Sequence, residues 1–257
     1  MKLTTIAAAI ALTANAQAVT ISIDTFDDAS LNVTQTGTTG GNVVVIVPPA
    51  IAPDPAVSFA ETNTAEAIGG VRETRVHVTS GSGANVANTT VNPGNLTWDL
   101  ASSTGGHFHL LYGASTIDAA GSSALNLDAT AADAFTSRFI FTDLSGSIKI
   151  SFLMNAGEGA AESIWSASFN VAGAIGDTGP ASPLDYNVLF SSFELDSGTG
   201  AFDLSDIDGI TYEVDADLVS RDWQIDSLSM TTITVPEPSS TALLGLGGLA
   251  LVLRRRK

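Results

Sequence analysis

Short runs of β-favouring residues alternate with turn residues along most of this chain. Two runs, 148–152 (Ile-x-Ile-x-Phe) and 210–214 (Ile-x-Tyr-x-Val), show the period of two that buries one face of a sheet. Gly, Ser, Asn, Asp and Pro separate successive runs, as in a sheet protein with short connections. We expect strands at 19–24, 43–47, 71–78, 96–100, 107–112, 148–154, 164–171, 188–195, 207–214 and 223–232.

The number and spacing of these runs predict the fold class. Many short strands separated by turns favour a sandwich, and the absence of a repeat period argues against a propeller or a solenoid. Residues 202–210 are similar to the start of a strand in lectin-like jelly rolls, in which the last strand (here around 223–226) pairs with the first (20–24). We therefore predict an all-β chain with a single β-sandwich ectodomain that is jelly-roll-like.

The first 18 residues have the order of a secretory signal peptide. Lys2 gives a basic start, and residues 6–12 form an apolar run that is too short to span a bilayer. Ala16-Gln17-Ala18 then supplies the small-x-small pattern that signal peptidase needs. We predict a signal peptide at 1–18, cleavage by signal peptidase after Ala18, and an ectodomain at 19–234.

The last residues form a three-part pattern. Val235-Pro236-Glu237-Pro238 precedes an uncharged Gly/Leu-rich segment at 239–253, and Arg254-Arg255-Arg256-Lys257 ends the chain. The segment is shorter than a standard span of about 20 residues, but arginine side chains that snorkel extend its reach. The basic tail stays on the cytoplasmic side. The pattern predicts a C-terminal transmembrane helix that anchors the chain transiently in the inner membrane.

This end, residues 235–257, resembles the PEP-CTERM sorting signal of Gram-negative bacteria. The resemblance implies processing by an exosortase, a membrane cysteine peptidase, near Pro236-Glu237-Pro238. It further implies that the ectodomain reaches the cell surface or the extracellular matrix, in association with exopolysaccharide and biofilm. Residues Val235, Pro236, Glu237 and Pro238 are then part of a substrate and not of a catalyst.

The distribution of charge along the chain limits the partners that it can bind. The net charge of the chain is −17. All but one of the 27 acidic residues lie between the two ends, where there are only five basic residues: Arg72, Arg75, Arg138, Lys149 and Arg221. Such a surface repels phosphate backbones, so we expect no nucleic-acid partner. The acidic surface suits solubility and divalent cations. Because the chain has no cysteine, its stability must come from packing and from sheet hydrogen bonds.

One acidic segment partly matches a calcium-binding loop. Asp206-x-Asp208-Gly209, with Asp215 downstream, fills several loop positions, but the first position lacks an oxygen ligand. We name Asp206, Asp208 and Asp215 as candidate calcium ligands, and no other cofactor is predicted. The alternative is a turn whose aspartates bind backbone amides. If the terminal strands pair, further ligands for a calcium ion come from Asp24, Asp27 and Asp226.

Two other residue types carry candidate chemistry. His107 and His109 share one face of a predicted strand, where two imidazoles can reach one transition metal, with His77 as the remaining histidine. Surface histidines at a strand start are the alternative. Trp98, next to Asp99, is the best candidate for an exposed ring that stacks on a sugar, whereas the alternation around Trp165 and Trp223 favours the core.

Catalytic motifs are absent from the sequence. The chain has no cysteine, no Gly-x-Ser-x-Gly elbow and no His-Glu-x-x-His helix. A glycosidase needs only two suitably spaced carboxylates, and with so many acidic residues some pair meets that spacing by chance, so its presence does not indicate an enzyme. We therefore predict no enzyme but an exported surface or matrix protein that binds or structures exopolysaccharide. The alternatives are a secreted polysaccharide-active enzyme on the same scaffold and a self-assembling structural subunit without a ligand.

Overall fold

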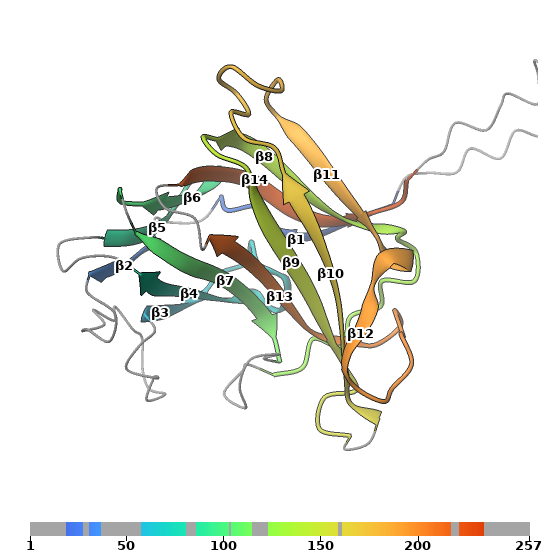
Figure 1. Cartoon of the computed structure of the whole chain (residues 1–257). Coiled ribbons are helices and arrows are strands. Elements are labelled where there is room, and N and C mark those ends of the chain that lie inside the picture. The colour runs from blue at the N-terminus through green and yellow to red at the C-terminus, as the bar shows by residue number, and fades with distance from the viewer. Residues whose placement is uncertain are drawn as a thin grey trace, which may run out of the picture.

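The computed structural model describes residues 19–27, 31–36, 58–80, 86–102, 104–114, 123–158, 161–216 and 221–233. The predicted signal peptide, the predicted strand at 43–47 and the predicted sorting signal at 235–257 lie outside these residues. Within them, regular structure is almost entirely strand (Figure 1).

The described residues form a succession of strands, with the 3-10 turns η1 (Ile68–Gly70) and η3 (Phe190–Ser192) among them. The strands are β1 (Thr20–Asp24), β2 (Leu31–Thr36), β3 (Ser58–Asn63), β4 (Val71–Ser80), β5 (Val86–Asn92), β6 (Asn95–Leu100), β7 (Gly105–Gly113), β8 (Ala134–Thr142), β9 (Gly146–Met154), β10 (Ser163–Val171), β11 (Leu184–Leu189), β12 (Glu194–Gly198), β13 (Ile207–Ala216) and β14 (Asp222–Thr231).

The strands form two antiparallel sheets that face each other (Figure 1). Sheet A has the order β11-β8-β14-β6-β5-β2, with β1 also paired to β14, and sheet B has the order β12-β10-β9-β13-β7-β4-β3. The chain changes sheet repeatedly, and no more than two consecutive strands among those described belong to the same sheet. The predicted β-sandwich is confirmed, and so is the pairing of the last strand with the first, in which Thr20 lies opposite Thr231.

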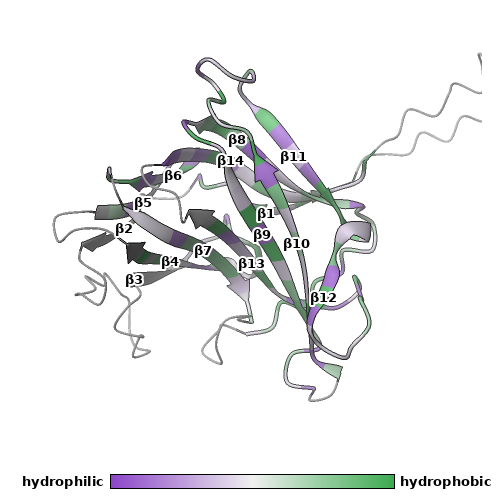
Figure 2. Cartoon of the chain, viewed as in Figure 1, coloured by the Kyte–Doolittle hydropathy of each residue, from purple (hydrophilic) through white to green (hydrophobic). Residues whose placement is uncertain are grey.

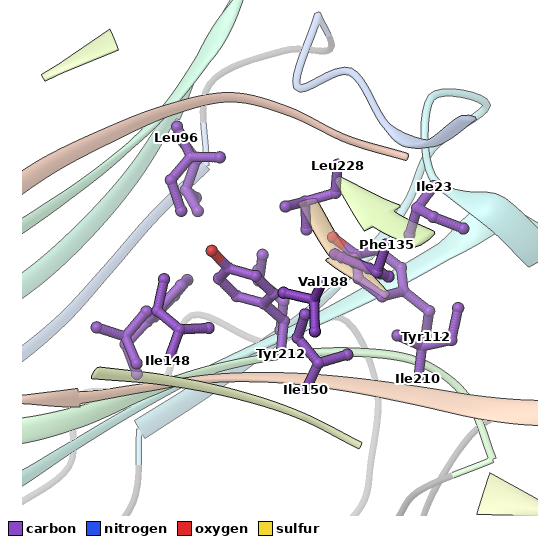
Figure 3. Close-up of a cluster of buried hydrophobic side chains, with 14 of the residues drawn as sticks. Ile23, Leu96, Tyr112, Phe135, Ile148, Ile150, Val188, Ile210, Tyr212 and Leu228 are labelled. Atoms are coloured by element: carbon purple, nitrogen blue, oxygen red, sulfur yellow. The ribbon is translucent and has the colours of Figure 1, made fainter. Parts of the chain in front are cut away.

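Alternation of side chains builds the core between the sheets. Phe135 and Leu228 of sheet A point toward Ile150, Ile210 and Tyr212 of sheet B, and all five are fully buried (Figure 3). Bands of hydrophobic and hydrophilic colour alternate along several strands, β7 and β11 among them (Figure 2). Burying one such apolar side chain contributes about 1.5–3 kcal/mol, so the inward residues dominate the stability of a chain that has no disulfide.

The strand predicted at 188–195 is wrong in its extent. β11 ends at Leu189, η3 carries the chain across to sheet B, and β12 begins at Glu194. Phe190 and Phe193 are both buried in the core, so the sequence stays apolar through the crossing and hides it. Four strands of the structure were not among the predicted runs: β2, β3, β5 and β8.

A buried ion pair joins the two sheets at the end of β1. Asp24 of β1 binds Arg72 of β4, with the Oδ2–Nε distance at 2.5 Å and the Oδ1–Nη2 distance at 2.6 Å. The Tyr112 hydroxyl of β7 donates to Asp24 Oδ2 at 2.8 Å, and the backbone N–H of Phe26 donates to Oδ1 at 3.0 Å. Asp24, Arg72 and Tyr112 are all fully buried. Burial and the Asp24 charge raise the pKa of Tyr112, so its hydroxyl keeps the proton that it donates.

We predict that Asp24→Ala lowers the free energy of unfolding by about 3–5 kcal/mol, because the buried Arg72 guanidinium loses the carboxylate that binds it. Urea unfolding of the purified protein measures the loss. The control is Asp185→Ala, which removes a half-exposed partner of Arg138 and costs less than about 1 kcal/mol. Replacing both partners, with Asp24→Leu and Arg72→Met, should recover most of the loss, and equal losses in the Asp24 and Asp185 variants would contradict the interpretation.

Candidate functional site

A row of polar side chains crosses the outer face of sheet B. Strand register places Arg75 of β4 opposite His109 of β7, and His109 opposite Glu213 of β13. Glu213 in turn lies opposite Lys149 of β9, which lies opposite Ser168 of β10. We call these five residues the polar row. Neighbouring strands are about 4.8 Å apart, so the row spans about 19 Å.

The alternation of each strand directs the row away from the core. His109 lies between Phe108 and Leu110, which are both fully buried beneath it. Three of its side chains remain within reach of solvent, since 16% of His109, 30% of Glu213 and 37% of Lys149 is exposed, whereas Arg75 is buried. The sequence marks such residues as outward-facing, but only the register shows which of them are neighbours.

Two imidazoles share one carboxylate in the middle of the row. The distance from Glu213 Oε1 is 3.8 Å both to His107 Nδ1 and to His109 Nε2. The two rings are stacked, with centroids 6.4 Å apart and planes inclined by 13°. Interaction with His109 lowers the pKa of Glu213 against the opposing effect of burial, so this side chain is a carboxylate at neutral pH. The sequence identified the histidine pair but not its acidic partner.

Ion pairs neutralise the two cations of the row, Arg75 and Lys149. Arg75 binds Glu73 on its own strand, and Lys149 Nζ donates to Asp196 Oδ2 of β12 at 2.7 Å. The hydrogen bond from Lys149 lowers the pKa of Asp196. Charges of both signs therefore alternate along this face, which differs from the acidic surface that the composition implies.

The predicted calcium ligands lie along one strand and not in a loop. Asp206 and Asp208 lie at the start of β13, whereas Asp215 lies near its other end and its side chain is outside the described residues. Asp215 lies seven positions along the strand from Asp208, which corresponds to about 23 Å. Asp208 is buried and accepts a hydrogen bond from the backbone N–H of Ala156 at 2.6 Å. The structure therefore brings together Asp206 and Asp208 and holds Asp215 away from them.

Burial and the neighbouring charges of Asp208 and Glu158 raise the pKa of Asp206. Of the three further candidates, Asp24 is occupied by Arg72 and Tyr112, and Asp226 lies on the surface with its Oδ2 at 3.1 Å from Arg138 Nε. Asp27 is exposed. These three carboxylates do not add ligands to Asp206 and Asp208, because Asp24 faces the core while Asp226 faces solvent.

The prediction of an exposed ring at Trp98 is wrong. Trp98 is only 2% exposed and its ring packs 5.0 Å from that of Phe108, because β6 directs it inward. Trp223 lies directly opposite on β14 and is buried as predicted, and Trp165 is partly buried against the core. Trp98 and Trp223 are therefore core residues, and Trp165 is only partly accessible.

A second group of carboxylates lies on sheet A. Asp99 of β6 and Asp222 of β14 are opposite each other, and Asp143 Oδ1 accepts the backbone N–H of Asp222 at 2.8 Å. Burial, a hydrogen bond with Asp99 and the charge of Asp143 raise the pKa of Asp222 to about 6. Two carboxyl groups in hydrogen-bond contact are closer than the pair of a glycosidase, which stands about 5–5.5 Å apart or more.

Residues 234–257 match the family described as the PEP-CTERM protein-sorting motif. The match confirms the resemblance seen at this end of the sequence, and it covers residues outside the described part of the structure. The chain carries a PEP-CTERM sorting signal, and this signal implies an exported, cell-surface protein. Within the described residues, no helix has the length and apolar character needed to cross a membrane.

The chain matches none of the curated proteins with which it was compared. Among solved structures it is similar to a family 11 carbohydrate-binding module from Clostridium thermocellum in complex with a beta-1,3-1,4-mixed-linked tetrasaccharide, with 13% identity and a TM-score of 0.39 over 82% of this chain and 94% of the module. The solution structure of CtCBM11 gives 13% identity and a TM-score of 0.44, over 87% of this chain and 100% of that chain. A CBM4 structure gives 10% identity and a TM-score of 0.31, over 81% and 97%. All three likenesses are distant.

We predict that Asp222→Asn flattens the pH dependence of stability. A carboxyl group whose pKa rises on folding stabilises the folded state fully below its unfolded value of 3.8, and this contribution is lost as the pH rises through about 6. The Asn variant should therefore gain stability relative to wild type at pH 8, by less than about 1 kcal/mol because solvent screens the pair. Urea unfolding at several pH values between about 4 and 8 measures it. Asp185→Asn, which loses an ion pair with Arg138, should show no such gain. A wild-type pH slope in the Asp222 variant would contradict the prediction.

Proposed function

We propose that this chain is a non-enzymatic protein of the Gram-negative cell surface or extracellular matrix, sorted by an exosortase-type system, whose β-sandwich binds an exopolysaccharide. The observation that carries the proposal is the PEP-CTERM match at residues 234–257. The signal-peptide pattern at 1–18 supports export from the opposite end of the chain.

In this proposal the two ends act in sequence. Signal peptidase cuts after Ala18 once the chain has entered the export pathway, and the apolar segment 239–253 holds the chain in the inner membrane. The exosortase then cuts near Pro236-Glu237-Pro238 and frees the sandwich. The products are an exported globular domain and a short membrane fragment.

The polar row supplies the proposed ligand surface. Arg75, His109 and Lys149 offer donors and Glu213 and Ser168 offer acceptors, at intervals set by the strand spacing. A polysaccharide presents hydroxyl groups at regular intervals, and these both donate and accept hydrogen bonds. Because no tryptophan stacks on the ligand, the contact depends on hydrogen bonds alone and is weak.

A neutral polysaccharide suits this surface better than an acidic one. The ectodomain carries far more acidic than basic residues, so its field repels a polyanion at long range. Glu73 and Asp196 pair with the two cations of the row, and Glu213 adds a negative charge at its centre. The hydroxyl groups of a neutral polysaccharide can hydrogen-bond to these side chains, and no like charges are brought together.

We predict that Pro236→Ala combined with Glu237→Ala blocks processing. The protein should then accumulate in the membrane fraction with its C-terminal peptide intact, whereas the wild-type protein should leave that fraction without residues 239–257. Fractionation followed by peptide mass spectrometry of the C-terminus measures both. Ser239→Ala, which changes a residue beyond the motif, is the control and should be processed. An intact wild-type chain in the cytoplasm, with both ends uncut, would contradict the proposal.

We predict that Lys149→Ala weakens polysaccharide binding about tenfold or more, because a charge-assisted hydrogen bond is worth about 1.5–3 kcal/mol. Affinity electrophoresis in neutral exopolysaccharides measures binding. Arg138→Ala removes an ion-paired base from the outer face of sheet A and should leave binding unchanged.

Three results of the same assays would overturn the binding proposal. Release of reducing sugar from the polysaccharide would identify an enzyme. Polymerisation of the protein without binding to any polysaccharide would favour a structural subunit. Equal effects of the Lys149 and Arg138 variants would place the contact elsewhere on the domain.

A further inference from the structure

All three histidines of the chain lie at adjacent positions of one sheet. His107 and His109 are two residues apart on β7, and strand register places His77 of β4 opposite His107. On the other side of β7, Glu213 lies opposite His109 and Asp215 lies opposite His107. Only the backbone positions of His77 and Asp215 are described, so the side chains that enter the argument are those of His107, His109 and Glu213.

We propose that His107, His109 and Glu213 bind a divalent transition metal ion of the zinc type on the outer face of sheet B. The proposed site differs from the predicted calcium site in its donors, which are two imidazoles and one carboxylate. Imidazole nitrogen suits zinc, copper and nickel, whereas calcium and magnesium require oxygen ligands.

The distances among the three side chains support one shared ion. Two ligands bound to zinc at about 2.1 Å in tetrahedral geometry stand about 3.4 Å apart. Glu213 Oε1 stands 3.8 Å from a nitrogen of each imidazole. As they stand, the described side chains form no group of three metal ligands. The proposed site therefore requires the three side chains to rotate toward a common point.

Burial leaves the site open to one further ligand. The side chains of His107, His109 and Glu213 are 23%, 16% and 30% exposed. Three protein ligands with a solvent-facing side leave a coordination position for water or for a ligand hydroxyl. The strands fix the spacing of the three residues, because β7 and β13 are central in sheet B.

The local charge also favours a cation. Lys149 and Arg75 flank the three residues along the row, but Asp196 and Glu73 pair with them. Glu213 lies at the centre of the row between these two ion pairs, and its carboxylate faces the two imidazoles. A divalent ion in this position replaces two weak imidazole–carboxylate contacts with three coordinate bonds.

Isothermal titration of the purified protein with zinc, nickel and copper ions, without an affinity tag, tests the proposal. A histidine tag must be absent because it binds the same ions. We expect one zinc ion per chain, and no comparable binding of calcium by these residues. Replacing both histidines, His107→Ala with His109→Ala, should weaken zinc binding about 100-fold or more, and Glu213→Gln about tenfold or more.

Asp226→Asn is the matched control, since it removes a surface carboxylate on the other sheet and should leave zinc binding unchanged. X-ray absorption of the zinc complex should show two imidazole nitrogens, a signature that does not depend on how well any variant folds. Zinc binding that persists in the double histidine variant would overturn the proposal, as would a zinc spectrum without imidazole. The probe is the metal alone, so a failure here leaves polysaccharide binding through Lys149 separately testable.

Discussion

The buried pair of Asp24 and Arg72 fixes how the two sheets sit against each other. Apolar side chains attract without direction and allow sheets to slide, whereas two charge-assisted hydrogen bonds allow a single arrangement. β1 belongs to sheet A, while β4 and β7 belong to sheet B, so Asp24, Arg72 and Tyr112 connect the layers. A buried ion pair adds little net stability, but breaking it is costly, and in a chain without cysteine it supplies a specific link between the layers.

Much of the fold was predictable because one face of most strands is buried. The alternation of Ile148, Ile150 and Phe152 is a local property, and it correctly identified a strand. β8 was not predicted because its first four residues, Ala134 to Ser137, are all buried, so alternation does not mark it. The crossing at Phe190 and Phe193 was missed for a related reason, since the chain stays in the core as it changes sheets.

The candidate site was less predictable, because its residues come from five strands that are distant in the sequence. The sequence identified His107 and His109 as a pair and Arg75 and Lys149 only as two of five bases, and nothing local joins these residues to Glu213 or Ser168. Trp98 shows that the burial of a side chain, too, could not be predicted from its neighbours in the sequence. Its neighbour Asp99 suggested exposure, while packing against Phe108, ten residues along the chain, decides its burial. Strand register determines which residues form the polar row, and packing between the sheets determines that Trp98 is buried.

The pairing register of β4 and β7 positions both their inward and their outward side chains. Arg72 and Tyr112 point inward to Asp24, and the outward residues of the same two strands, Arg75 and His109, begin the polar row. An inward contact that fixes β4 against β7 therefore also fixes the spacing of groups on the surface. The row lies on the central strands of sheet B, whose backbone groups are hydrogen-bonded on both sides and cannot shift independently. If this face binds a polysaccharide through hydrogen bonds, as proposed, this rigidity favours binding because no free energy is spent on ordering the protein.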